Sequence, residues 1–208
     1  MEALVKPRLR GVFHEIAFFA AVALAAPLTL TAEPGRARLS AIVFSACLAG
    51  CFGMSALYHR PTWRPAIRSR LARLDHAGVY LLIAGTYTPF TLIGLRGEVG
   101  RTLFIAIWSL AAAGIAFKLF FTGRFKLLST LVYVAMGWLV LLAIKPVWQA
   151  LDAWTLGWLL AGGVAYTLGT VFYHRPSMRY SHAVWHLFVI AGSTCHYIAV
   201  LAQVHATA

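Results

Sequence analysis

The chain has 208 residues, of which 61% are apolar and 12% charged, and its mean hydropathy is +0.76. A soluble domain carries about a quarter charged residues because its surface has to be hydrated, so this composition excludes a water-soluble globule and indicates lipid as the main solvent. The net charge of +12 would indicate nucleic-acid binding in a soluble protein, but here the basic residues fall between apolar runs, and we expect no nucleic-acid partner.

Seven apolar runs are long enough to cross a bilayer. A hydrocarbon layer of about 30 Å takes about 20 helical residues. The runs that reach this length cover residues 12–30, 39–58, 75–95, 101–121, 127–147, 154–173 and 182–204. The sequence therefore predicts an all-α, polytopic membrane protein in which residues 1–208 form a single seven-transmembrane-helix bundle.

The distribution of lysine and arginine predicts the orientation of this bundle. Thirteen basic residues lie before the first run or in the loops after the second, fourth and sixth runs, and five lie on the opposite side. Because cytoplasmic loops are enriched in lysine and arginine, we expect a cytoplasmic N-terminus and an outside C-terminus in a cell (inner or plasma) membrane. The sequence does not define an oligomeric state.

Two segments, one before the third run and one inside it, have more than one interpretation. Residues 66–74 place Ile67, Leu71 and Leu74 at helical spacing beside arginines, which fits either a short amphipathic helix on the inner surface or a solvated basic loop. Pro89 interrupts the run itself, where hydroxyls of Thr86 and Thr88 can bond carbonyls that a proline leaves without a donor. The proline should kink the helix, and the kink would either widen the bundle or form a cavity that admits lipid.

Polar side chains gather at the predicted inner face. Ser55 and His59 end the second run, Asp75 opens the third, and His182 and His186 begin the seventh. Ionisable groups at such depth are costly, so they are functional candidates. Each residue alone has an ordinary interpretation, such as an ion pair between Asp75 and the nearby arginines. Because residues from three predicted helices lie at the same depth, we favour a functional site.

The histidine spacing predicts a metal ion. His182 and His186 stand four residues apart and share one helical face, so both imidazoles can bind one ion. His59 is the expected third ligand, with His76 and His174 as alternatives, and three histidines with an open fourth position are typical of catalytic zinc. Imidazole also suits copper, iron or nickel. Asp75 would bind the metal directly or hold its water, with Ser55 hydrogen-bonding nearby.

Three sequence blocks resemble the haemolysin-III-like branch of the progestin and adipoQ receptor (PAQR) family. They are SALYH at 55–59, LDH at 74–76 leading into IAGTYTP at 83–89, and SHAVWH at 181–186. The resemblance covers essentially the whole chain and implies seven helices, a cytoplasmic N-terminus and zinc near the inner face. It implies further that His59, His182 and His186 hold the zinc, with Asp75 and Ser55 adjacent.

The same resemblance implies what the protein does. Eukaryotic relatives are lipid-linked receptors with ceramidase-type activity, whereas bacterial relatives carry the haemolysin name and are associated with membrane fluidity. We therefore expect a Zn²⁺-dependent hydrolase of a lipid amide or ester, with membrane lipids as partners and Asp75 and Ser55 as catalytic residues. The alternative is a non-enzymatic homeostasis factor or lipid-sensing receptor with structural zinc. A pore-forming cytolysin fits less well, because the chain is apolar throughout.

Overall fold

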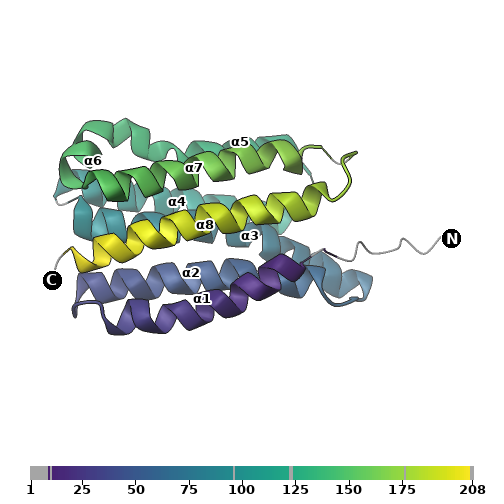
Figure 1. Ribbon diagram of the computed structural model, residues 1–208. Helices are drawn as coiled ribbons and strands as arrows, with labels where there is room; N and C mark the ends of the chain where they lie inside the picture. The colour runs from purple at the N-terminus through teal and green to yellow at the C-terminus, as the bar shows by residue number, and fades with distance from the viewer. Residues whose placement is uncertain (1–8, 10, 96, 122–123, 176, 207–208) are drawn as a thin grey trace.

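The structure is a computed structural model that describes residues 9, 11–95, 97–121, 124–175 and 177–206. Within these residues it is entirely helical, and the helices run roughly side by side in one bundle (Figure 1). The elements are α1 (Val12–Leu30), α2 (Arg36–His59), α3 (Pro65–Pro89), the π-helix η1 (Phe90–Gly94), α4 (Glu98–Phe121), α5 (Lys126–Gly137), the 3₁₀-helix η2 (Leu139–Ala143), α6 (Ile144–Ala150), α7 (Ala153–Tyr173) and α8 (Ser181–His205).

Seven of the described helical segments are long and apolar enough to cross a membrane, when Pro65–Gly94 and Lys126–Ala150 each count as one. The predicted seven-helix membrane fold is therefore confirmed. The start of α1 and the end of α8 lie at opposite ends of the bundle, as an odd number of crossings requires (Figure 1). Many large apolar side chains, such as Phe120 and Leu142, point outward and are exposed, which fits a surface solvated by lipid.

The third span begins earlier than the apolar run that predicted it. α3 starts at Pro65, so residues 66–74 are neither a separate surface helix nor a loop but the first turns of the span. Proline is favourable at the first helical position, because an N–H at that position has no partner within the helix and proline has no N–H. The residues that follow it lack glycine and proline up to Gly78, so nothing breaks the helix. Asp75 consequently lies in about the third turn of α3.

Proline also ends α3 where the sequence predicted a break. The chain passes from Pro89 into η1, a single π-helical turn. Thr86 donates to the carbonyl of Leu82 and Thr88 to that of Ala84, so both hydroxyls bond their own helix. Pro89 has no N–H to donate to the carbonyl of Gly85, four residues before it. The two threonines bond the carbonyls of Leu82 and Ala84 and not that of Gly85.

The fifth span, predicted over residues 127–147, covers Lys126–Ala150 in the structure, and its α-helix is interrupted near the middle. α5 ends at Gly137, η2 follows, and α6 begins at Ile144. The hydroxyl of Tyr87 fills the break: it lies 3.0 Å from both the Met136 and the Gly137 carbonyl oxygens and accepts from the Val140 N–H at 2.9 Å. A side chain from α3 thus supplies hydrogen bonds that an intact helix would make internally.

α2 and α3 approach closely because small residues face each other. A Cβ added to Gly85 would lie 2.5 Å from the Cβ of Cys47, and one added to Gly78 would lie 3.3 Å from the Cα of Cys51. The two cysteines are free thiols and act as small packing residues. Small residues allow helix backbones to come together in lipid, and here they align the helix that carries His59 with the helix that carries Asp75.

Candidate metal centre

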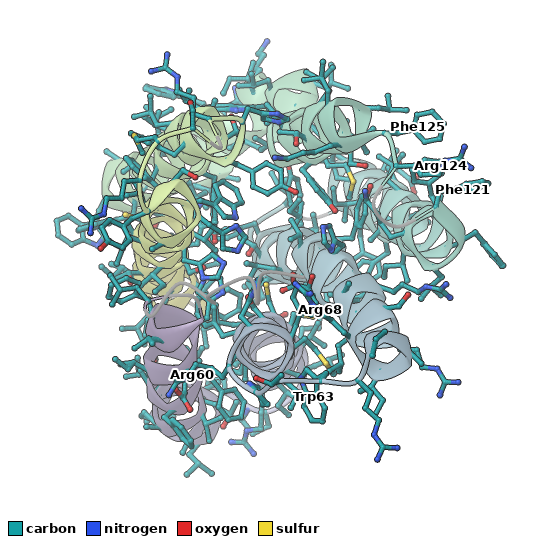
Figure 2. The ribbon with its side chains drawn as sticks, turned by 90° about the vertical axis from the view of Figure 1, so that its right-hand side faces the viewer. Arg60, Trp63, Arg68, Phe121, Arg124 and Phe125 are labelled. Atoms are coloured by element: carbon teal, nitrogen blue, oxygen red, sulfur yellow. The ribbon has the colours of Figure 1, made fainter. Side chains whose placement is uncertain are left out.

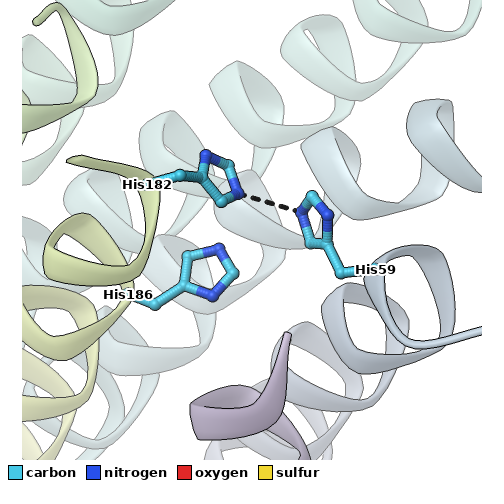
Figure 3. Close-up of side chains that lie close together, drawn as sticks. All are labelled: His59, His182 and His186. Carbon is cyan, nitrogen blue, oxygen red and sulfur yellow. Dashed lines mark hydrogen bonds between the residues drawn. The ribbon is translucent and has the colours of Figure 1, made fainter. Parts of the chain in front are cut away.

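Three imidazoles meet at one end of the bundle, called the histidine end below. His59 is the last residue of α2, and His182 and His186 lie in the first two turns of α8 (Figure 3). One nitrogen from each ring can be chosen so that all three lie within 4.8 Å of one another. His59 and His186 are buried and His182 is half-buried. The structure therefore brings together the three histidines that the sequence singled out.

The spacing of these rings suits a metal ion. The Nε2 atoms of His59 and His182 are 3.1 Å apart, which is also hydrogen-bond distance. Two nitrogens that bind one tetrahedral zinc at 2.0–2.1 Å lie about 3.3 Å from each other, so the pair needs little movement to share an ion. The ring of His186 lies 4.4 Å from that of His182 and 5.3 Å from that of His59, centroid to centroid. The cluster can hold a metal ion of the kind that imidazole binds.

Asp75 lies beside the nitrogen of His59 that faces His182. Its Oδ2 is 3.8 Å from His59 Nε2 and 3.9 Å from His76 Nδ1. Many metal sites place a carboxylate behind the ligand histidine, on the nitrogen that does not bind the ion. Asp75 instead approaches the Nε2 side, where the three imidazole nitrogens converge. Its carboxylate can therefore reach the ion or a molecule next to it.

Ser55 occupies the position that the helical spacing predicts. It lies one turn before His59 on α2, it is buried, and it borders the same cavity as the three histidines and Asp75. Its role and that of Asp75 stay predictions.

The alternative third ligands are engaged elsewhere. The Nε2 of His174 is 2.9 Å from the hydroxyl of Thr130 on α5. Burial and the positive charge of Lys126 lower the pKa of His174. The Nδ1 of His76 lies 2.6 Å from the carbonyl oxygen of Ala72 in its own helix. Neither residue joins the three-histidine cluster among the described residues.

The start of α1 also reaches this site, which sequence reasoning missed. Gly11, which precedes α1 with a φ of +84°, packs so closely that an added Cβ would lie 2.6 Å from the Cβ of His59. His14 is buried, and its ring stacks on that of His186 with centroids 3.8 Å apart and planes 4° apart. Glu15 accepts a hydrogen bond from Arg60. The sequence feature that could have predicted this is the position of His14 in the first turn of its span, level with the other histidines.

A cavity of about 440 Å³ opens from this cluster into the bundle. Its histidine end is polar, with His59, Asp75 and His186, and it continues past the Pro89 break along apolar residues such as Leu82, Phe90 and Leu156. Along α8 its lining runs from His182 to His196, which is about 21 Å at 1.5 Å per residue. One leaflet of a bilayer is about 15 Å of hydrocarbon, so the cavity is long enough for an acyl chain.

The histidine end is also the basic end of the molecule. Figure 2 looks onto it and shows Arg60, Arg68 and Arg124 at the helix ends and the loops that join them. Arg68 lies 6.0 Å over the ring of Tyr58. Basic side chains at this end agree with the predicted cytoplasmic orientation, which stays a prediction because it concerns the membrane and not the fold.

Comparison with known proteins identifies the family. A family model described as haemolysin-III related matches residues 2–197. Hemolysin-3 of Bacillus cereus is 49% identical over 144 residues, which are 69% of this chain and 66% of that protein. The hemolysin-3 homolog of Bacillus subtilis (strain 168) is 42% identical over 163 residues, 78% of this chain and 76% of that protein.

A more distant human protein, monocyte to macrophage differentiation factor, is 26% identical over 171 residues, 78% of this chain and 69% of that protein. The resemblance inferred from the three sequence blocks is therefore confirmed. The chain is a multi-pass membrane protein that belongs to the haemolysin-III-related family.

Proposed function

We propose that this protein is a zinc-dependent hydrolase that cleaves an amide or ester bond of a membrane lipid, and so acts in membrane lipid and fluidity homeostasis in the cell membrane. The observation that carries the proposal is the opening of the three-histidine cluster, with Asp75 beside it, into a long and mostly apolar cavity inside the helix bundle. A soluble substrate would have no use for such a cavity.

Each residue has a defined task in this reaction. His59, His182 and His186 would hold the zinc ion, which when bound polarises a carbonyl and lowers the pKa of water. Asp75 takes a proton from the water that attacks the carbonyl carbon. As the C–N or C–O bond breaks, Asp75 returns that proton to the leaving amine or alcohol. Ser55 orients the carbonyl or the carboxylate through its hydroxyl.

The cavity contributes binding and exclusion of water. Its volume is within the range of about 300–1,000 Å³ that is typical of ligand pockets, and most of its lining is apolar. An acyl chain along α8 would place the scissile bond at the histidine end, because the three-histidine cluster and Asp75 lie there. Removal of water around Asp75 strengthens its electrostatic interaction with the reacting groups.

The test uses purified protein in detergent with its zinc content measured. We expect release of fatty acid from one or more lipids in a panel of N-acyl and O-acyl substrates. Asp75→Asn should retain zinc and lose at least about 100-fold in rate, because a positioned general base contributes about that much. Wild-type protein that contains zinc but cleaves none of these lipids would contradict hydrolysis.

Two further outcomes separate the competing functions. If Asp75→Asn keeps zinc and also keeps the protein's effect on membrane fluidity in cells, the ion is structural and the protein is a non-enzymatic homeostasis factor. Rapid dye leakage from liposomes at low protein concentration would instead support pore formation, an activity that would fit the name hemolysin-3 of the Bacillus cereus relative.

A further inference from the structure

His14 is a polar residue that the proposed reaction does not use. It lies in the first turn of α1 and borders the cavity, and its side chain is 4% exposed. Neither ring nitrogen makes a hydrogen bond of good geometry among the described residues, although the ring lies near the backbone of His186. Buried polar groups are almost always hydrogen-bonded, because an unsatisfied donor or acceptor loses its interaction with water and gains nothing. The two nitrogens therefore indicate a partner that is not part of the described chain.

The surroundings of His14 show where that partner would bind. Its ring stacks in parallel on His186 at 3.8 Å, and Phe52 contacts it with a centroid distance of 5.0 Å. Figure 3 shows the start of α1, in purple, next to the rings of His59 and His186. The ring is thus held by aromatic contacts, with its nitrogens left for a ligand at the histidine cluster.

The stacking distance distinguishes two possible roles. An ion bound by His186 lies close to the plane of that ring, 2.0–2.1 Å from its nitrogen. A parallel ring about 3.8 Å away is too distant to be a further ligand of the same ion. The His14 ring is well placed to hydrogen-bond a small molecule or headgroup that binds next to the ion. Such a molecule has atoms further from the ion than its ligands are, within hydrogen-bond reach of the ring.

We propose that His14 binds, through a ring nitrogen, the non-protein ligand of the three-histidine site. In the working protein this ligand would be the carbonyl or hydroxyl oxygen of a lipid headgroup. The inference rests on the proposed metal site and adds a residue from a fourth helix, α1, to it. Gly11 makes the arrangement possible, since any side chain there would push the start of α1 away from His59.

The experiment uses protein loaded with Co²⁺, whose visible absorption reports the ligands of the ion, and azide as the probe. His14→Phe keeps an aromatic ring for the stack but removes both nitrogens, and His14→Gln restores a hydrogen-bonding group. His205→Phe is the matched control, because His205 is an exposed histidine at the opposite end of α8, near Thr31. Size-exclusion chromatography in detergent checks the fold of each variant.

We expect His14→Phe to bind Co²⁺ within about threefold of wild type and to bind azide about tenfold more weakly, the value of one hydrogen bond. His14→Gln should recover part of the azide affinity, and His205→Phe should match wild type. Equal azide affinity in His14→Phe and wild type would overturn the inference, and so would loss of Co²⁺ binding in His14→Phe. Failure of wild type to bind Co²⁺ or Zn²⁺ at all would overturn the metal site itself.

Discussion

Replacing Gly85 with alanine tests the contact between α2 and α3 that aligns His59 with Asp75. The added methyl group would lie 2.5 Å from the Cβ and 2.8 Å from the Sγ of Cys47. Carbon atoms in good contact are about 3.5–4.0 Å apart, so the two helices have to separate by about 1 Å. Overpacking of this kind costs about 1–3 kcal/mol, and we expect the free energy of unfolding to fall by about 2 kcal/mol.

The assay is unfolding by SDS titration in mixed micelles, with a double-mutant cycle. Cys47→Gly removes both atoms that the new methyl group meets, so the double variant Cys47→Gly/Gly85→Ala should recover most of the loss caused by Gly85→Ala. Gly50→Ala on α2 is the matched control, because nothing lies within 4 Å of its added Cβ. Its stability should equal that of wild type or exceed it slightly, since alanine is the better helix former.

Two results would refute this reasoning. Gly85→Ala could be as stable as wild type, which would mean that α2 and α3 do not approach as closely as the structure shows. Alternatively, the double variant could show the simple sum of the two single effects, which would mean that Cys47 and Gly85 are not in contact.

Three other changes test separate parts of the structure. His59→Ala and His186→Ala should reduce bound zinc in purified protein to background, whereas His174→Ala, whose ring contacts Thr130, should keep wild-type zinc; equal loss in all three would contradict the assigned ligands. Tyr87→Phe should lower the free energy of unfolding by about 1–3 kcal/mol, because the Val140 N–H loses its acceptor inside the bundle; unchanged SDS unfolding would show that the hydroxyl does not bridge the break. Burial and the charge of Lys126 lower the pKa of His174 below its usual 6.5, so the folded protein holds fewer protons there than the unfolded chain. Stability should therefore decrease as the pH falls below about 6.5, and His174→Gln should flatten that dependence between pH 5 and 7; identical profiles would refute the assignment.

The spans and the three-histidine cluster were predictable because they depend on local properties of the sequence. Hydropathy over about 20 residues reports burial in lipid, and the first span was predicted to the residue, Val12–Leu30. The spacing of His182 and His186 fixes their common face within one helix. His59 followed from depth alone, since the ends of neighbouring spans meet at the same membrane surface.

The features that the sequence did not predict depend mainly on interactions between distant segments, which a hydropathy profile cannot report. The break in the fifth span depends on the hydroxyl of Tyr87, which is about 50 residues earlier in the chain. The early start of α3 was missed because its first turns carry arginines and do not enter the apolar run. The place of His14 at the site was missed because it depends on a stack with His186 that joins α1 to α8.

The separation of the metal ligands along the chain has a consequence for biosynthesis. His59 and His182 are 123 positions apart, so a ribosome must complete six spans before the second and third imidazoles exist. A partly inserted chain offers a single histidine of the three and has no chelating site. We expect ion capture to follow the docking of α8 against α2, so bound metal would mark polypeptides whose insertion has finished.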